Sequence, residues 1–213
     1  MKKITTLLAF ACLTMTMQAQ IFLPGDRTFH PAKIVLQCGE SFEALARIPF
    51  GGDVYYRMDN DSPIIRQRDR DTEMRYILYM PENSEPFLIE RISWIANATR
   101  RRPTTMTGWW QVKITGPVNL YVNYFGVSGV VRQAAIVFIV RRAGEAGIPM
   151  FQKDLTVGTV GRSRTNRYFY RQAAEYFATY PQLAERISLR LPGYRAEDIV
   201  EIVREYNARM SQN

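Results

Sequence analysis

The sequence predicts an α+β protein, in which an antiparallel β-sandwich or a partly closed β-barrel precedes a three-helix C-terminal tail. Three observations lead to this prediction. Residues 20–152 contain short runs of β-branched and aromatic residues with turn signals between them. Residues 153–165 hold glycines and arginines without apolar periodicity, which is typical of a linker. Residues 166–213 carry apolar residues at helical spacing.

Residues 1–19 have the three parts of a secretory signal peptide. A positive start, Met1-Lys2-Lys3, is followed by an apolar stretch from Ile4 to Met17 and by Gln18-Ala19-Gln20, which suits cleavage after Ala19. This apolar stretch is shorter than the roughly 20 residues that cross a bilayer as a helix, and no later apolar run is longer. We therefore expect an exported protein without a transmembrane segment. Lipidation of Cys12, as in a lipoprotein, remains an alternative.

The β-rich region contains eight or nine predicted strands. The first strand ends at Gly39-Glu40 and is followed by a hairpin partner, and Thr115-Gly116-Pro117 joins a second hairpin. The run from Ala134 to Val140 is nearly continuous in apolar residues, as in a strand buried on both faces. The predicted strands are 33–38, 42–48, 53–58, 74–80, 87–95, 109–114, 118–125, 134–140 and 148–151.

Three helices are predicted in the tail. Asn166 is a candidate cap for the first, whose apolar residues have helical spacing. Pro181 begins the second, which carries Leu183 and Ile187 four positions apart, and Pro192-Gly193 ends it. The third, Ala196 to Met210, has an apolar side and a charged side. Because helices this short are marginal alone, we expect the tail to pack on the β-rich domain or on a partner.

The tail resembles one found on many uncharacterised exported proteins of Bacteroidota, in which a small β-domain is followed by a helical tail. The segment from Trp110 to Tyr121 also resembles a hairpin of that group. The chain departs from the group at Tyr180, where cysteine is common. The resemblance implies a location in the cell envelope and carries over no catalytic residues. Because the chain ends in a predicted helix, unlike the β-rich sorting domain of cargo exported to the cell surface in such bacteria, we expect the periplasm or the outer membrane rather than the cell surface. The matching residues are Tyr176-Phe177, Pro181-Gln182-Leu183, Ile187 and Tyr206-Asn207.

The sequence lacks the residues that most catalytic and metal sites require. His30 is the sole histidine and is expected in a surface loop, so a catalytic triad is not predicted. Cys38 is expected to be a buried thiol on its strand. The acidic segment Asp59 to Ser62 is expected to form a turn rather than to bind calcium. We therefore predict neither a metal nor a cofactor.

The excess of basic over acidic residues instead indicates anionic partners. The net charge is +8, and loss of Lys2 and Lys3 with the signal peptide would lower it to +6. If 66–70 is a strand, its alternating arginines share one face. The alternative is a solvated loop in which Asp69 and Asp71 neutralise these arginines. The candidate anion-binding residues are Arg66, Arg68, Arg70, Arg100, Arg101 and Arg102.

The sequence therefore favours a non-enzymatic binding or structural module of the bacterial cell envelope. Its expected partner is an anionic envelope component or another envelope protein. Nucleic acid is not an expected partner, because export and the lack of a recognisable module argue against it. The alternative is a carbohydrate-active enzyme that depends on carboxylates, since a pair of acids at a set separation leaves no sequence motif. The oligomeric state stays open.

Overall fold

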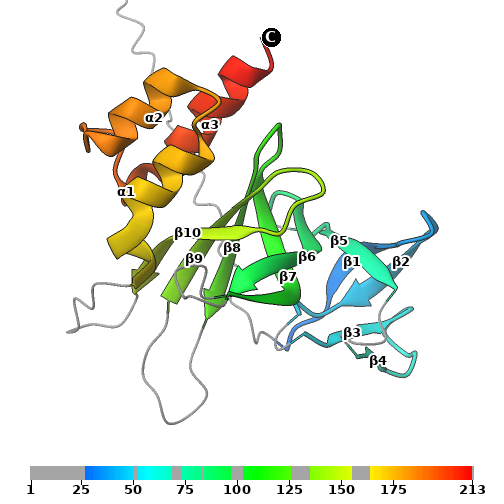
Figure 1. The fold of residues 1–213 in the computed structure, drawn as a ribbon. Helices are drawn as coiled ribbons and strands as arrows, with labels where there is room; N and C mark the ends of the chain where they lie inside the picture. The colour runs from blue at the N-terminus through cyan, green and yellow to red at the C-terminus, as the bar shows by residue number, and fades with distance from the viewer. Residues whose placement is uncertain are drawn as a thin grey trace, which may run out of the picture.

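The structure is a computed structural model that describes residues 27–49, 52–68, 73–82, 84–96, 103–125, 135–154 and 164–212. In these residues the chain forms one antiparallel sheet of ten strands followed by three α-helices, which confirms the predicted α+β organisation (Figure 1). None of the described helices has both the length and the apolar character needed to cross a membrane.

The ten strands form a single open sheet in which neighbours run antiparallel. Their order is β10-β9-β8-β7-β6-β5-β1-β2-β3-β4, so β10 and β4 are its edges. Because the sheet is not closed, the finer prediction of a sandwich or barrel is not confirmed. The strands are β1 (His30–Leu36), β2 (Ser41–Ala46), β3 (Val54–Arg57), β4 (Ile65–Gln67), β5 (Met74–Tyr79), β6 (Phe87–Ala96), β7 (Thr104–Ile114), β8 (Asn119–Phe125), β9 (Ala135–Arg141) and β10 (Ile148–Asp154).

The turn between β1 and β2 corrects the prediction for Cys38. Strand β1 ends at Leu36, and Gly39 turns the chain with φ at +95°, a conformation that favours glycine. Cys38 therefore lies in an exposed turn instead of the core. His30 is also corrected, because it is the half-buried first residue of β1 and pairs with Ala46 rather than lying in a loop.

Strand β7 begins earlier than its apolar pattern suggested. Its first residues, Thr104 to Thr107, are exposed and lack apolar alternation, but they pair with the end of β6. Within this strand a Cβ on Gly108 would lie 3.5 Å from the indole nitrogen of Trp110 and 3.6 Å from that of Trp94. Both are ordinary van der Waals distances, so Gly108 lies in contact with these two tryptophans, whose rings meet edge to face.

Strands β6 to β10 curve until β6 meets the turn before β10. The amide of Ile95 donates to the carbonyl of Gly147 over 2.8 Å, and the amide of Gly147 donates to the carbonyl of Ser93 over 2.8 Å. A Cβ on Gly147 would lie 2.5 Å from a methyl carbon of Ile139, so the approach depends on glycine. The side chains enclosed by this curve include Ile92, Trp110, Tyr121 and Ile139.

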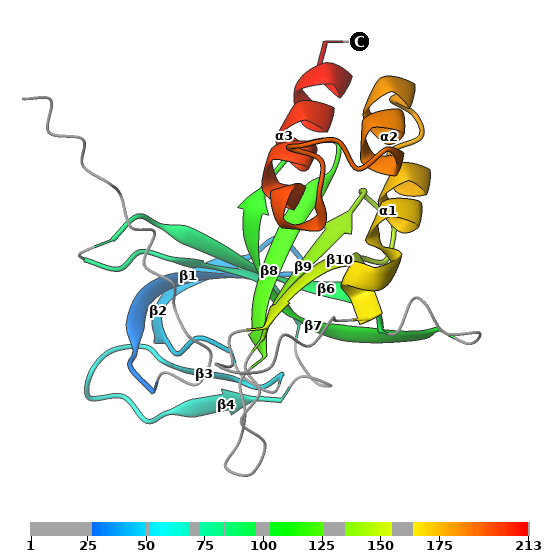
Figure 2. The same ribbon diagram turned by 90° about the vertical axis from the view of Figure 1, so that its left-hand side faces the viewer.

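The helical tail covers one end of the sheet, as predicted. Figures 1 and 2 show the helices over the β8–β10 end and away from β3 and β4. Fully buried apolar residues of the helices share a core with β8 to β10, among them Phe169, Phe177, Leu183 and Ile199. The helices are α1 (Arg164–Tyr176), α2 (Pro181–Ser188) and α3 (Ile199–Met210), with a 3-10 turn over Ala196–Asp198.

Two asparagines fasten the tail to the sheet in the same way. The amide of Asn207 on α3 accepts from Val118 N over 2.9 Å and donates to Val118 O over 2.7 Å, although the residues are far apart in sequence. Asn166 on α1 accepts from Gln152 N over 2.8 Å and donates to Gln152 O over 2.7 Å. Asn166 therefore lies inside its helix and bonds the edge strand β10, which corrects its predicted role as a cap.

Arg142, just after β9, adds a third contact to the tail. Its guanidinium lies 4.1 Å from the ring centre of Tyr176 and donates to the carbonyl of the same residue. Burial raises the pKa of Tyr176 to about 12. Ionisation of this phenol is therefore harder in the folded chain than in the unfolded chain. The resulting contribution to stability is fully present below the ordinary tyrosine pKa and is lost as pH rises toward 12.

Candidate functional site

Arg47 and Arg66 lie beside Tyr55 on one face of the sheet, where β2, β3 and β4 are neighbours. The amide of Arg47, which follows β2, donates to the carbonyl of Tyr55 on β3 over 2.9 Å, and Tyr55 pairs with Arg66 on β4. The guanidinium carbons of Arg47 and Arg66 each lie 5.8 Å from the ring centre of Tyr55. The cross-strand register thus produces the row Arg47–Tyr55–Arg66.

Phe29 extends this row with a second aromatic ring. The guanidinium carbons of Arg47 and Arg57 lie 4.4 Å and 4.6 Å from its centre, within the range of cation–π contacts. Arg57 also donates to the carbonyl and the side-chain oxygen of Asn60, each over 2.7 Å. We call Phe29, Arg47, Tyr55, Arg57 and Arg66 the arginine ladder.

The ladder carries more positive than negative charge. Arg66 donates to one oxygen of Asp53 over 2.8 Å and 2.5 Å, and these hydrogen bonds raise the pKa of its guanidinium. Among the residues that the structure describes, neither Arg47 nor Arg57 makes an ion pair, and the Nε of Arg47 has no hydrogen-bond partner. The ladder therefore holds two arginines with free capacity to bind an anion.

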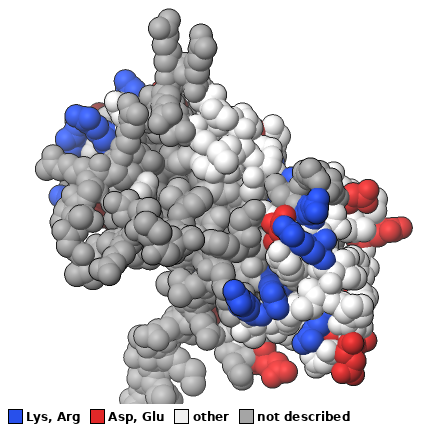
Figure 3. All heavy atoms as spheres, turned by 90° about the horizontal axis from the view of Figure 1, so that it is seen from below, with Lys and Arg blue, Asp and Glu red and all other residues white. Residues whose placement is uncertain are grey.

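The surface around the ladder is mixed in charge. Figure 3, which looks from below at the side where β3 and β4 lie, shows Lys and Arg side chains with Asp and Glu side chains between and beside them. A compact group of arginines, rather than a continuous basic face, is thus the feature available for recognition. Such a group binds a carboxylate, phosphate or sulfate through short, charge-assisted hydrogen bonds.

Of the two predicted arginines that the structure describes, Arg66 joins the ladder. Arg68 is exposed and lies just beyond the end of β4, so it does not continue the alternation of that strand. Arg70 and the predicted residues Arg100, Arg101 and Arg102 lie outside the described residues.

Phe29, Arg47 and Arg57 were not predicted as site residues. A local signal exists for Arg57, because Asp53, Tyr55 and Arg57 alternate in the sequence as residues on one face of a strand do. The contribution of Phe29 and Arg47 depends on the pairing of β1, β2 and β3, which no local pattern reveals.

Asp59 forms the turn that was expected between β3 and β4. One of its oxygens accepts from the amides of Asp61 and Ser62 over 2.9 Å and 2.7 Å and from the hydroxyl of Ser62 over 2.7 Å. These bonds, led by the one from the Ser62 hydroxyl, lower the pKa of Asp59. The hydrogen bonds of this carboxylate therefore stabilise the turn.

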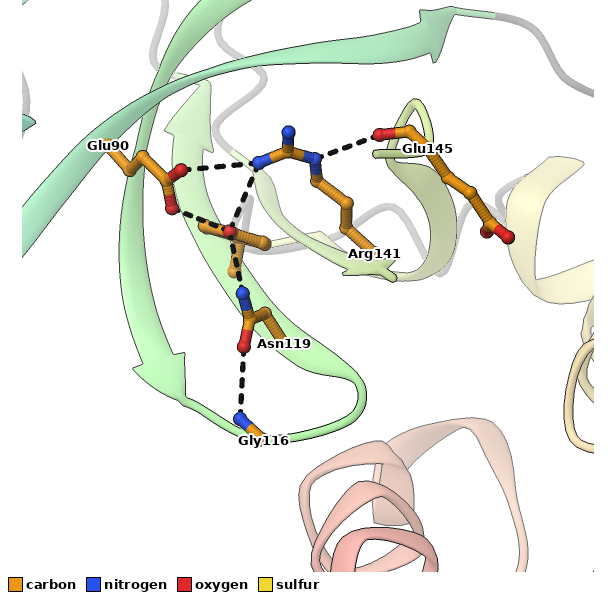
Figure 4. A network of polar contacts seen from close by, with 6 residues as sticks. Glu90, Gly116, Asn119, Arg141 and Glu145 are labelled. Carbon is orange, nitrogen blue, oxygen red and sulfur yellow. Dashed lines mark hydrogen bonds and ion pairs between the residues drawn. The ribbon is translucent and has the colours of Figure 1, made fainter. Parts of the chain in front are cut away.

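A second polar cluster joins side chains of β6, β8 and β9 beside the β7–β8 turn (Figure 4). The hydroxyl of Tyr121 on β8 donates to Glu90 on β6 over 2.6 Å, and Arg141 on β9 donates to the other Glu90 oxygen over 3.2 Å. Asn119 links the cluster to the β7–β8 turn, because it donates to Tyr121 over 3.2 Å and accepts from the amide of Gly116 over 3.0 Å. Burial and the bond to Glu90 raise the pKa of Tyr121.

This cluster is built to hold strands together. Both oxygens of Glu90 are occupied, and Arg141 also donates to the carbonyl of Glu145 over 2.9 Å in the turn before β10. A hydrolytic pair would need a second carboxylate facing Glu90 across a cleft. The described contacts of Glu90 are instead to Tyr121 and Arg141, so the cluster joins β6, β8 and β9.

A small hollow lies on the opposite face of β6 to β8, beside Trp109. It encloses about 20 Å³, which is room for a water-sized group but not for a sugar or nucleotide. Its lining residues are Ile48, Pro49, Phe87, Ile89, Trp109, Gln111, Val122, Asn123 and Tyr124.

Comparison with known protein families, with curated proteins and with solved structures found no match for this chain. A functional proposal for it therefore rests on the geometry of its own residues.

Proposed function

We propose that this protein is a non-enzymatic binding module of the bacterial cell envelope that holds an anionic group on the arginine ladder. The observation that carries the proposal is that Arg47 and Arg57 both lie against the Phe29 ring, with neither paired to a described carboxylate. Stacking on an aromatic ring fixes the guanidinium plane, so little side-chain entropy is lost when an anion binds.

The helical tail leaves this surface free. It docks on the β8–β10 end, whereas the ladder lies on β2 to β4 at the other end of the sheet. The two bonds between β6 and Gly147 support the view that β6 to β10 act as a partly closed barrel, a rigid base for the open half. The tail then serves to complete the core of this base.

The location in the envelope is part of the proposal. It is supported by the signal-peptide pattern of residues 1–19 and by the resemblance of the tail to exported proteins of Bacteroidota. Mass spectrometry of the protein from its native host should give an N-terminus near Gln20. An intact Met1 would contradict export, and a lipid on Cys12 would identify an anchored lipoprotein instead.

Replacing both Arg47 and Arg57 with alanine should weaken binding of the mature protein to heparin, used as a polyanionic probe. A hydrogen bond to a charged group contributes about 1.5–3 kcal/mol, so we expect affinity to fall by about tenfold to a hundredfold. The salt dependence of the remaining binding should become shallower, because fewer charges meet the probe. Titration calorimetry at two salt concentrations measures both effects.

The matched control removes the same charge from the tail. Arg167 and Arg209 are exposed on α1 and α3, and their double alanine variant should bind heparin nearly as well as the unaltered protein. An equal loss in both double variants would show that net charge alone governs binding and would refute the ladder. Alanine at Arg100, Arg101 and Arg102 tests separately whether those residues enlarge the surface.

A further inference from the structure

The turn between α2 and α3 exposes two leucines on the outside of the tail. Every residue from 188 to 193 is exposed, with Leu189 at 62% and Leu191 at 39%. Ile187, the preceding apolar residue, is by contrast fully buried in the core that the helices share with the sheet. Figures 1 and 2 show α2 on the side of the tail that faces away from the sheet. Large apolar residues that face solvent together mark a surface for a partner with an apolar part.

The backbone between the two leucines has a conformation that favours glycine. Among the described residues other than glycine, Arg190 alone has φ in the left-handed region, at +55°. Its amide donates to the carbonyl of Ile187 over 3.0 Å, and the amide of Leu191 donates to the carbonyl of Arg186 over 3.2 Å. This pair of bonds ends a helix in a Schellman motif, whose left-handed residue is usually glycine. The backbone cost of an arginine here indicates that its side chain has a role beyond the fold.

The exposed run carries a positive charge and no negative charge. The guanidinium carbon of Arg190 lies 4.6 Å from the ring centre of Tyr170 on α1, a cation–π contact that orients the arginine. In the part of the chain that the structure describes, neither Arg190 nor Arg195 forms an ion pair, whereas Arg186 is paired with Glu205 over 3.1 Å. The other acidic residues near the turn lie outside the run and are Glu185, Glu197 and Asp198.

This combination fits a phospholipid surface better than it fits another protein. In a bilayer the phosphate groups lie directly above the acyl chains, so protruding leucines can enter the apolar layer while an arginine between them binds phosphate. A stable protein interface buries about 800 Å² on each partner with close shape complementarity. Two leucines on a single turn, flanked by arginines, offer much less apolar surface than that, and a bilayer needs no complementary shape.

We propose that the α2–α3 turn inserts Leu189 and Leu191 into the surface of a phospholipid bilayer, with Arg190 bound to lipid phosphate. The tail would then attach the protein to a membrane, while the arginine ladder at the other end of the sheet stays free for its own anionic partner. This inference does not depend on the ladder, because the two surfaces share no residue.

Binding to vesicles of phosphatidylcholine and phosphatidylglycerol in equal parts tests the insertion. The mature protein is used with Arg47→Ala and Arg57→Ala in place, so that the ladder contributes nothing to binding. Adding Leu189→Ser and Leu191→Ser should weaken binding by about tenfold or more, because two apolar side chains no longer leave water. The matched control replaces Ile64 and Met106, which are 50% and 49% exposed on the β-rich domain, with serine and should bind as before. Co-sedimentation with the vesicles measures the affinities.

Arg190→Gly separates the role of the side chain from its effect on the fold. Glycine accepts the left-handed conformation, so the thermal unfolding midpoint should stay the same or rise by about 2–4 °C. Binding to the same vesicles should nevertheless fall by about fivefold, the usual effect of one basic residue near an anionic lipid surface. A variant that is as stable as the parent but binds vesicles less well supports the contact with phosphate. Unchanged binding of this variant overturns it.

Tryptophan placed at the turn measures the insertion directly. Quenching by lipids brominated on their acyl chains should be stronger for Leu191→Trp than for Met106→Trp, after subtraction of the signal of the native tryptophans. Equal quenching of the two, or vesicle binding that ignores Leu189→Ser and Leu191→Ser, overturns membrane insertion. A protein dimer in sedimentation velocity that the same double variant dissociates would assign the leucines to a second copy of the chain and would equally overturn it. Heparin offers charge without an apolar layer, so the ladder is tested separately and stands or falls alone.

Discussion

Replacing Phe177 with alanine should lower the free energy of unfolding by about 3–5 kcal/mol, the usual cost of truncating a buried phenylalanine. Phe177 is fully buried and its ring centre lies 5.2 Å from that of Tyr176 and 5.1 Å from that of Tyr206. It thus joins α1 to α3 in the core that both share with β8 to β10. Because small domains are stable by only about 5–15 kcal/mol, this change should come close to undocking the tail.

Urea unfolding followed by circular dichroism measures the loss, and limited proteolysis shows where it acts. The control is Tyr168→Ala on α1, the helix that Phe177 follows, because Tyr168 is only half-buried and lies beside Arg171 instead of in the shared core. Residues 166–210 should resist protease in the control and become sensitive in Phe177→Ala. Equal stability of the two variants would contradict the docking of the tail.

Replacing Asn207 with alanine should destabilise the protein through the backbone of Val118. Val118 is fully buried, and its amide and carbonyl both bond to the Asn207 side chain. A buried polar group left without a partner costs about 1–3 kcal/mol, and this variant leaves two of them. Asn166→Ala should cost less, because Asn166 is half-buried and serves an edge strand that water reaches more easily.

A double-mutant cycle with Gly116 isolates the contact of Asn207 with the β7–β8 turn. A Cβ on Gly116 would lie 2.6 Å from the side-chain nitrogen of Asn207, so Gly116→Ala should displace the amide. The same change should cost less when Asn207 is already alanine, because the clash is gone. Additive losses in the two backgrounds would show that Asn207 does not pack against this turn.

Local structure was the part of the fold that the sequence predicted well. Glycine and proline signals located the β1–β2 and β7–β8 turns, and helical spacing placed Leu183 and Ile187 on the buried side of α2. These features depend on residues that are close in sequence. Neighbouring residues alone therefore sufficed to identify them.

Features that depend on distant residues were missed or wrongly assigned. Asn166 has the chemistry of a cap, but it bonds Gln152 on β10 instead, and the pairing of Asn207 with Val118 spans most of the second half of the chain. Cys38 fits the alternation of β1, but the strand ends before it because Gly39 forms the turn. In each case a tertiary contact or a turn prevailed over a local preference.

In the candidate site, too, the features that depend on neighbouring residues could be predicted and those that depend on distant residues could not. Asp53, Tyr55 and Arg57 alternate in the sequence as residues on one strand face do, and Asp53 binds Arg66 across β3 and β4. Phe29 and Arg47 come from other strands, and their place beside Arg57 follows from the order β1-β2-β3 in the sheet. Sheet order is set by the whole core, so the sequence indicated arginines but not the ladder.

Hydrogen–deuterium exchange of the mature protein, with and without heparin, tests most directly whether the arginine ladder is the binding surface. Heparin should slow exchange in peptides that cover 44–49 and 52–68, where the ladder arginines lie. Peptides from 164–212 should exchange at the same rate in both samples, and the protection should vanish in the double alanine variant of Arg47 and Arg57. Protection confined to the helical tail, or unchanged in that variant, would contradict the assignment of the ladder.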